Sequence, residues 1–206
     1  MPNSQNIELH PLQPFLPENA RVLMLGSFPP PKERWCMDFF YPNPQNDMWH
    51  IMGQVFFGNK QHFCTPDKRF KHPEIAAFCS TQGIAIFDTA QAVIRLQGNA
   101  SDEHLEIVER TDIAALLQQL PWCHDICCTG GKAAETLAEI IAETSADSSE
   151  KSAVAVPKVG DCVETVLDDR PIRFWRMPSS SRAYPLSLDN KSAAYHRMFA
   201  AIGFLP

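Results

Sequence analysis

Residues 21–31 read Arg-Val-Leu-Met-Leu-Gly-Ser-Phe-Pro-Pro-Pro, a short apolar run that stops abruptly at turn residues. The length of the run and the residues that close it predict a buried strand over Arg21–Leu25. The glycine at position 26 lets the chain turn sharply and lets a ligand approach the backbone amides. Three prolines then stiffen the exit, and a stiff loop presents a binding site at a low entropic cost.

Three more apolar segments of this kind follow, and together the four predict the fold class. They are Gly83–Asp88, Asp125–Thr129 and Pro171–Arg176. Near-continuous apolar strands suit a parallel sheet that is covered on both faces. Helical patterns lie between or after them, over Asp47–Phe57, Asp112–Leu120, Lys132–Glu143 and Leu188–Ile202. The alternation predicts an α/β fold, a three-layer α/β/α sandwich with a central, mostly parallel four-stranded sheet.

The length of the chain, 206 residues, fits a single α/β domain. We therefore expect one domain over residues 1–206. Within it, the polar, proline-rich residues 1–17 are expected to form an N-terminal extension. Residues 144–152 are small and polar, which is typical of a flexible loop.

The formal net charge of −6 argues at first against a nucleic-acid binder, whose basic groups must neutralise phosphates. The acidic excess, however, lies in residues 101–170, which contain 15 acidic and 5 basic side chains. Residues 171–206 contain one acidic side chain and five basic ones: Arg173, Arg176, Arg182, Lys191 and Arg197. The net charge therefore does not exclude a nucleic-acid partner, whose footprint would be one-sided and salt-sensitive, with an acidic back.

Several classes of protein are disfavoured by the composition. No apolar run approaches the roughly 18 residues that span a bilayer, so no membrane partner is expected. The N-terminus lacks a charged leader before an apolar core, and the seven scattered cysteines are typical of reduced thiols. We therefore expect a cytoplasmic, bacterial-type intracellular protein, and a monomer. A metal site could form only from dispersed ligands, so no metal and no cofactor are expected.

In an open parallel sheet, ligands bind beyond the carboxyl ends of the strands, and two loops there are rich in unusual residues. The first, residues 39–49, reads Phe-Phe-Tyr-Pro-Asn-Pro-Gln-Asn-Asp-Met-Trp. A base could stack on one of its three aromatic side chains: Phe39, Phe40 and Tyr41. Asn43 and Asn46 carry carboxamides that both donate and accept. Asn46 could equally cap the helix that begins near Asp47.

The second loop carries Met177-Pro178-Ser179-Ser180-Ser181-Arg182-Ala183-Tyr184. Its hydroxyls and amides suit phosphate contacts, and Arg182 can reach a phosphate or stack on a base. The alternative is an ordinary serine-rich turn. Gly130-Gly131-Lys132 suggests a phosphate loop, but Ile126 stands where that motif needs its first glycine. The helix start at Lys132 could still contact a DNA phosphate.

Taken in order, the motifs resemble those of a known superfamily. They are Gly26-Ser27-Phe28-Pro29, then Tyr41-Pro42-Asn43-Pro44-Gln45-Asn46 leading into Trp49, then Gly83-Ile84-Ala85-Ile86-Phe87-Asp88, and Met177-Pro178-Ser179-Ser180-Ser181. This set resembles the signature of the uracil-DNA glycosylase superfamily. It is most similar to the hypoxanthine-DNA (deoxyinosine) glycosylase branch, which has Gly-Ser-Phe-Pro and a downstream His-Pro-Gln-Asn. The serine motif resembles that of the mismatch-specific thymine/uracil glycosylases.

The sequence departs from the superfamily pattern at three positions. Other branches place an activating Asp or Asn where this chain has Phe28, which cannot polarise water. Residue 43 is Asn where the hypoxanthine branch usually has His, and Met177 replaces a His of the classical uracil glycosylases. Asn46 matches the asparagine to which catalysis in the branch is attributed. The resemblance therefore makes Asn46 the first candidate for the catalytic residue and Asn43 the second.

The resemblance implies a monofunctional DNA glycosylase that acts in base excision repair. Such an enzyme flips a deaminated base, hypoxanthine or uracil, out of the DNA and hydrolyses its N-glycosidic bond, which leaves an abasic site. A carboxamide is a poor general base, so Asn46 would position the attacking water. The amide and hydroxyl of Ser27, or nearby backbone N–H groups, are the candidates for stabilising the charge on the departing base. The expected partner is DNA with deaminated or mismatched bases.

The candidate base-binding residues are Gly26, Ser27, Phe28, Phe40, Tyr41 and Asp88. An ionised Asp88 would accept from a ring N–H of the base, or it would cap the segment that follows it. The candidate DNA-binding residues are Lys132, Ser179, Ser180, Ser181, Arg182 and Tyr184. Arg182 would fill the gap left in the duplex or clamp phosphates, and Tyr184 is the alternative wedge.

Two other hypotheses compete with the glycosylase. A non-catalytic lesion-binding relative of the same fold is motivated by Phe28 and Asn43. An α/β-hydrolase-like or nucleotide-binding protein that uses the Gly26 loop is disfavoured, because no serine is flanked as Gly-x-Ser-x-Gly.

Overall fold

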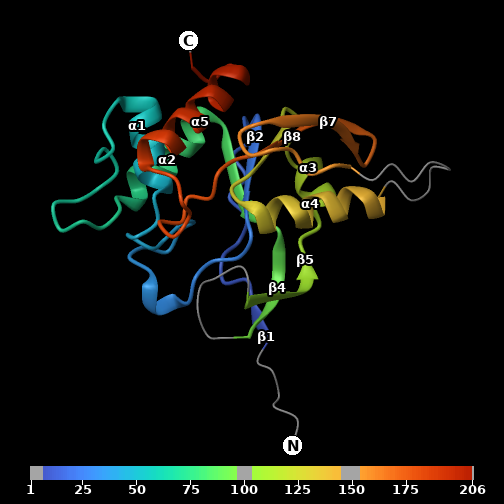
Figure 1. Ribbon diagram of the computed structural model, residues 1–206, viewed down its shortest axis with the longest axis horizontal. Coiled ribbons are helices and arrows are strands. Elements are labelled where there is room, and N and C mark those ends of the chain that lie inside the picture. The colour runs from blue at the N-terminus through green and yellow to red at the C-terminus, as the bar shows by residue number, and fades with distance from the viewer. Residues whose placement is uncertain (1–6, 97–103, 145–153, 206) are drawn as a thin grey trace, which may run out of the picture.

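The central element of the fold is a five-stranded sheet. A computed structural model describes residues 7–96, 104–144 and 154–205, and Figure 1 shows its ribbon. The strands lie in the order β3 (Ile84–Asp88), β2 (Val22–Gly26), β6 (Asp125–Cys128), β8 (Arg170–Arg176) and β7 (Cys162–Leu167). The first four are parallel and coincide with the four predicted segments. Every residue of β2, β3 and β6 is buried, which explains their continuous apolar runs.

The predicted number of four strands is wrong, because β7 adds a fifth strand antiparallel to β8 at the edge of the sheet. β7 reads Cys-Val-Glu-Thr-Val-Leu and is largely half-exposed, so it lacks the apolar run of the other strands. A tight turn at Asp168 and Asp169 joins β7 to β8, and these residues have φ angles of 51° and 60°. Two positive φ angles are typical of a two-residue hairpin, but Asp-Asp lacks the glycine that usually signals one.

A second sheet, which the sequence pattern did not predict, is antiparallel and has three strands. Its order is β1 (Ile7–Leu9), β4 (Ala90–Arg95) and β5 (Leu105–Arg110), and it lies toward the N-terminal end of the ribbon in Figure 1. Part of the expected extension over residues 1–17 is therefore built into the fold: β1 pairs with β4, and Phe15 pairs with Ile86 of β3. The expected flexible loop, residues 144–152, lies outside the described residues apart from Thr144, which ends α4.

The helices of the described residues pack on both faces of the five-stranded sheet. They are α1 (Met48–Phe57), α2 (His72–Gln82), α3 (Ile113–Gln118), α4 (Gly131–Thr144) and α5 (Leu188–Ala201), with a short 3₁₀ turn, η1, at Lys32–Arg34. In Figure 1, α1, α2 and α5 lie on one side of the sheet and α4 lies on the other. The pattern predicted all except α2, whose few buried side chains make only a narrow apolar stripe. None of the described helices is long and apolar enough to span a membrane.

The carboxyl ends of the parallel strands meet at one edge of the sheet. The strand register places Gly26 of β2 beside Asp88 of β3, and Leu25 beside Cys128 of β6. The serine loop leaves β8 at the same edge, where the backbone N–H of Met177 donates to Cys128 O at 2.8 Å. Loops that are far apart in sequence are therefore brought together at this edge.

Candidate active site

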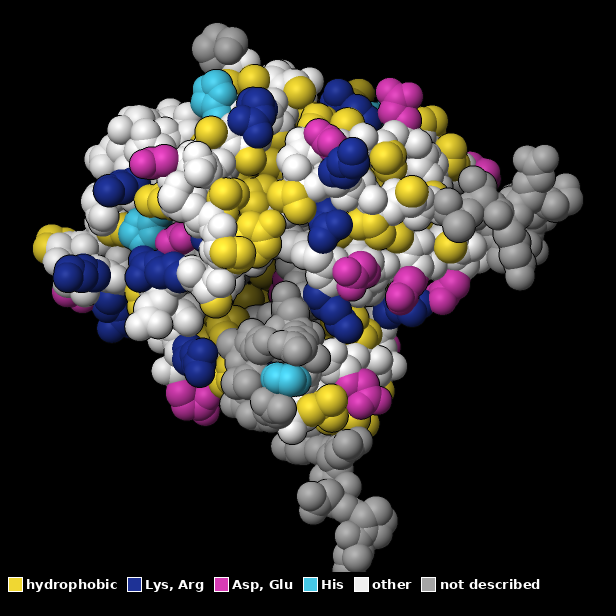
Figure 2. All heavy atoms as spheres, in the orientation of Figure 1, with side chains coloured by type: hydrophobic (Ala, Val, Ile, Leu, Met, Phe, Trp, Pro, Cys, Tyr) yellow, Lys and Arg dark blue, Asp and Glu magenta, His cyan; other side chains and the backbone are white. Residues whose placement is uncertain are grey.

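A pocket of about 440 Å³ opens at this edge, a size within the usual range of small-molecule sites. The face of the molecule seen in Figure 2 has a hollow in its middle, with hydrophobic, Lys and Arg side chains around it. Most of the predicted site residues line the pocket: Gly26, Ser27, Phe28, Phe40, Tyr41, Asn43, Asn46, Asp88, Ser179, Ser180, Ser181 and Arg182. Arg34 and Thr129, which no sequence motif indicated, also line it.

Three residues singled out from the sequence do not line this pocket. Tyr184 follows the last lining residue of the serine loop, and Lys132 lies in the first turn of α4. That turn is close to the serine loop, because a Cβ on Gly130 would lie 3.7 Å from the Ser179 Cβ. Phe39 is buried in the core, where its ring packs edge-on against that of Phe15 at a centroid distance of 5.1 Å. It is therefore unsuited to stack on a base.

Gly26, Asp88 and Tyr41 form one compact group in the pocket wall. The Asp88 carboxylate lies so close to Gly26 that a Cβ there would overlap Asp88 Oδ1. Tyr41 has a φ of 50°, and its hydroxyl lies 2.9 Å from Thr129 Oγ1. Desolvation, and secondarily the charge of Asp88, raise the pKa of Tyr41 well above its ordinary value, so the hydroxyl stays protonated. The wall thus presents a carboxylate beside a neutral hydroxyl.

We expect Gly26→Ala to destabilise the protein, because the added methyl must displace the Asp88 carboxylate. Overfilling a tight site costs about 1–3 kcal/mol of the free energy of unfolding, which urea denaturation measures. Adding Gly26→Ala to Asp88→Ala should cost much less than adding it to the wild type, because the group that clashes is gone. A single variant as stable as the wild type would show that the two residues are not in close contact.

Both candidate catalytic carboxamides are held by the backbone of their own loop. Asn46 Oδ1 accepts from the N–H of Met48, the first residue of α1, and Asn43 Oδ1 accepts from the N–H of Gln45, each at 2.9 Å. Asn46 therefore does bond the start of the helix, as the capping alternative predicted. The two interpretations are compatible, because the same side chain lines the pocket. Fixing the oxygen also orients the NH₂ group and the second lone pair of each carboxamide.

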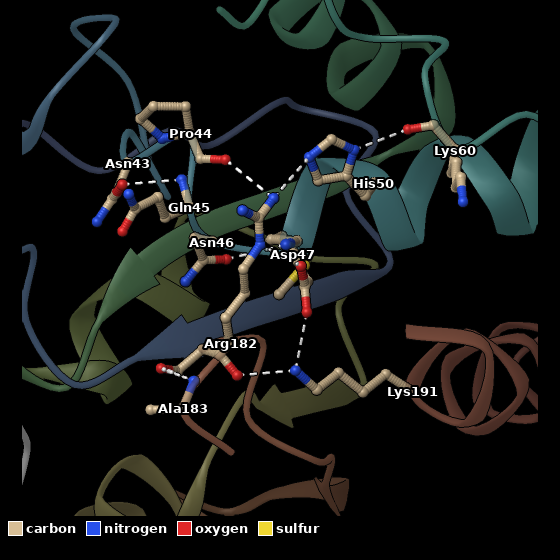
Figure 3. Close-up of polar contacts among 12 residues, drawn as sticks. Asn43, Pro44, Gln45, Asn46, Asp47, His50, Lys60, Arg182, Ala183 and Lys191 are labelled. Atoms are coloured by element: carbon tan, nitrogen blue, oxygen red, sulfur yellow. Dashed lines mark hydrogen bonds and ion pairs between the residues drawn. The ribbon is translucent and has the colours of Figure 1, made fainter. Parts of the chain in front are cut away.

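Asp47 joins the two motif loops, as Figure 3 shows. Its backbone N–H donates to Ser180 O at 2.8 Å. Its carboxylate accepts from Arg182 Nε at 3.0 Å and from Lys191 Nζ at 2.9 Å. Lys191 also donates to Ser181 O at 2.7 Å, and its side chain is only 1% exposed. Because a buried ammonium needs a partner, this cluster holds the two loops in one geometry.

Arg182 is directed toward the first motif loop. Besides Asp47, its guanidinium donates to Pro44 O at 3.2 Å and lies 3.4 Å from His50 Nε2 (Figure 3). Its side chain is 51% exposed, so it remains accessible from solvent. Three cations of the C-terminal segment are thus paired with carboxylates: Arg173 with Asp125 at 2.7 Å, and Arg182 and Lys191 with Asp47. The free positive charge of this segment is therefore smaller than the charge count suggests.

His10 does not line the pocket, but it contacts Asp88, which does, and no sequence pattern indicated it. Its Nε2 lies 2.9 Å from Asp88 Oδ2, although 78 positions separate the two residues in the chain. This bond replaces the alternative in which Asp88 caps the following segment, since that segment is the strand β4 and not a helix. Asp88 is therefore a paired carboxylate in the pocket wall, and the expected N-terminal extension supplies its partner.

Comparison with known proteins decides the family. No family model matches the chain. A hypoxanthine DNA glycosylase from Methanosarcina acetivorans is 30% identical over 122 residues, which are 58% of this chain and 70% of the relative. The chain belongs to the uracil-DNA glycosylase superfamily. Within the superfamily it falls in the hypoxanthine-DNA glycosylase branch, which the order of its motifs had indicated.

A solved structure has the same fold as this chain. The NMR structure of a candidate uracil DNA glycosylase, also from Methanosarcina acetivorans, matches with a TM-score of 0.63 and covers 96% of this chain and 99% of that chain. At 20% identity, the likeness shows the fold alone. The α/β architecture is thus that of the uracil-DNA glycosylase superfamily, with a mixed five-stranded sheet. Among the described residues, no group of three or more His, Cys, Asp or Glu side chains could hold a metal ion.

Proposed function

We propose that this protein is a monofunctional DNA glycosylase that acts as a single domain and a monomer. It flips deaminated bases, hypoxanthine or uracil or both, out of DNA and removes them by hydrolysis. One observation carries the proposal: the ordered glycosylase motifs converge on one pocket, which places the Asn46 carboxamide and the Asp88 carboxylate in the same cavity. Membership of the superfamily supports cleavage of the N-glycosidic bond as the reaction.

The reaction needs a positioned water and stabilisation of the departing base. The sugar develops oxocarbenium character while negative charge builds on the base. Asn46 positions the water, because its oxygen is already fixed by the Met48 N–H and its side chain faces the pocket. Ser27, which also lines the pocket, supplies donors for the charge on the base. Asn43 is the second candidate for the water.

The base is recognised by Asp88 and by the aromatic residues of the wall. An ionised carboxylate only accepts, so Asp88 matches N1–H of hypoxanthine or N3–H of uracil. Phe28, Phe40 and Tyr41 line the same pocket and offer apolar faces for the flipped base. Phe28 stands where other branches carry a water-activating residue, so this chain uses the position for packing against the base rather than for activating water.

The DNA backbone is held beside the pocket by the serine loop. Ser179, Ser180 and Ser181 line the pocket rim with hydroxyls and amides that suit phosphate oxygens. Lys132 extends this contact from the start of α4, and Arg182 or Tyr184 fills the gap left in the duplex. Extrusion of a base costs a few kcal/mol and is cheapest at mismatched or damaged pairs. Because several cations are already paired, binding to undamaged DNA is weak and salt-sensitive.

The test measures base release and binding on the same duplexes. Hypoxanthine- and uracil-containing duplexes are incubated with excess protein, abasic sites are cleaved with alkali, and binding is followed by fluorescence anisotropy. We expect abasic sites to accumulate at the deaminated base. Binding without base release would favour the second candidate, a non-catalytic lesion-binding protein. The observation that favours this candidate is Phe28, which stands where other branches carry a water-activating residue. Neither binding nor release would contradict both.

A further inference from the structure

His10 and Asp88 make a buried contact to which the proposed function assigns no role. The His10 Nε2 lies 2.9 Å from Asp88 Oδ2, and their side chains are 1% and 9% exposed. The other carboxylate oxygen, Oδ1, occupies the space that a side chain at position 26 would fill. One oxygen of Asp88 is therefore held by His10, and the other lies where Gly26 leaves room in the pocket wall.

The surroundings of the other ring nitrogen indicate which atom of His10 carries the proton. Nδ1 lies 3.2 Å from the Leu12 N–H and 2.9 Å from Leu12 O. If Nδ1 accepts from the N–H, the neutral ring has its proton on Nε2. If Nδ1 instead donates to the carbonyl, an unprotonated Nε2 would place its lone pair against a lone pair of the Asp88 carboxylate, which is repulsive. In that arrangement both ring nitrogens therefore carry a proton. With an ionised Asp88, both arrangements make Nε2–H the donor to Oδ2.

The ring of His10 is fixed in place by its neighbours. It packs against Phe87 at a centroid distance of 4.5 Å and edge-on against Phe28 at 5.3 Å. The backbone N–H of His10 donates to Gln91 O at 2.8 Å, which continues the pairing of β1 with β4. His10 is therefore a fixed support of the lining residue Asp88 and not the end of a loose extension.

The same N-terminal segment also supports the Gly26 loop. Glu8 of β1 accepts from Arg95 Nε at 2.9 Å, and the Arg95 side chain is only 6% exposed. Arg95 in turn donates to Pro29 O at 2.5 Å and lies over the Phe28 ring at 5.5 Å. Glu8 and His10 thus support two parts of the pocket wall, the Gly26 loop through Arg95 and the lining residue Asp88 directly.

We propose that His10 is a positioning residue that holds Asp88 as an obligate hydrogen-bond acceptor for a ring N–H of the flipped base. The inference rests on the proposed glycosylase function. Deamination converts N1 of adenine and N3 of cytosine from acceptors into N–H donors. A carboxylate that cannot donate therefore accepts hypoxanthine and uracil and repels the lone pair of adenine or cytosine. Guanine and thymine carry the same N–H, so other contacts in the pocket exclude them.

The test compares two variants of matched shape, His10→Gln and His10→Met. Both replacements are equal in length, but only Gln ends in an N–H that can donate to Asp88. Single-turnover release of hypoxanthine at saturating protein is expected to fall by about 10- to 100-fold in His10→Met. The His10→Gln variant is expected to release hypoxanthine close to the wild-type rate. Thermal unfolding of both variants shows whether they fold.

A double-mutant cycle with Asp88→Ala separates positioning from packing. If His10 acts through Asp88, adding His10→Met to Asp88→Ala causes no further loss, whereas an independent packing role multiplies the two losses. Multiplied losses, or equal rates for His10→Gln and His10→Met, overturn the inference and leave the glycosylase function standing. If His10→Met fails to fold, His10→Gln decides: a wild-type rate supports the inference and a tenfold loss overturns it. A wild-type protein that releases no base overturns the proposed function, and the inference falls with it.

Discussion

Asn46→Ala is expected to lower the single-turnover rate of hypoxanthine release by about 10²- to 10³-fold, the usual cost of removing one preorganised polar group from a catalytic site. The carboxamide is the group we assign to positioning the water, and nothing in the alanine side chain replaces it. Affinity for the same duplex should change much less, because phosphate contacts supply most of it. The rate is measured with protein in excess over a hypoxanthine duplex, with alkaline cleavage of the abasic site as the signal.

Two controls separate catalysis from folding. Asn46 Oδ1 accepts from the Met48 N–H, so alanine also removes a helix-start contact worth about 1 kcal/mol. Asn46→Asp keeps an acceptor for that N–H and should restore stability. Asn43→Ala is the matched variant, since Asn43 makes the same kind of contact in the same pocket. A larger loss in Asn43→Ala than in Asn46→Ala would exchange their roles.

Asp47→Ala is expected to destabilise the protein by about 3–5 kcal/mol, the cost of stripping the partner from a buried charge. Lys191 is 1% exposed and would keep only the Ser181 carbonyl as a partner. For a chain of this size, the loss lowers the melting temperature by roughly 10 °C. Differential scanning calorimetry measures the shift.

Removing both charges distinguishes the buried pair from simple loss of packing. In Asp47→Ala/Lys191→Met the uncompensated ammonium is gone, so the double variant should be more stable than Asp47→Ala alone. A shift of about 2 °C corresponds to a loss of about 1 kcal/mol in the free energy of unfolding. If Asp47→Ala melts within about 2 °C of the wild type, the cluster does not hold the loops together.

The elements of the fold that could be predicted are those whose own residues form a recognisable sequence pattern. The strands β2, β3 and β6 are fully buried and largely apolar, because both faces of the sheet are covered, and β8 carries a shorter apolar signal in Ile172, Phe174 and Trp175. The edge strand β7 and the small second sheet are half-exposed, so their sequences alternate weakly and resemble loops. Their pairing partners, not their own residues, make them strands.

The candidate site divides in the same way. Gly26, Asn46 and the serines lie in loops with unusual composition, and they do line one pocket. The partner of Asp88 could not be predicted, because His10 reaches it from 78 positions away through the pairing of β1 with β4. Likewise, Arg182 was interpreted from its own loop, while its partner Asp47 belongs to the other. Contacts between distant segments leave no local pattern in a single sequence.

The central claim is tested most directly by a profile of base release. A set of duplexes that differ in one base is treated with excess protein and scored for abasic sites. The variable base is hypoxanthine, uracil, xanthine, thymine opposite guanine, adenine or cytosine. The account predicts sites at hypoxanthine, uracil or both, none at adenine or cytosine, and their loss in Asn46→Ala. Release of adenine or cytosine at a comparable rate, or release that Asn46→Ala leaves unchanged, would contradict it.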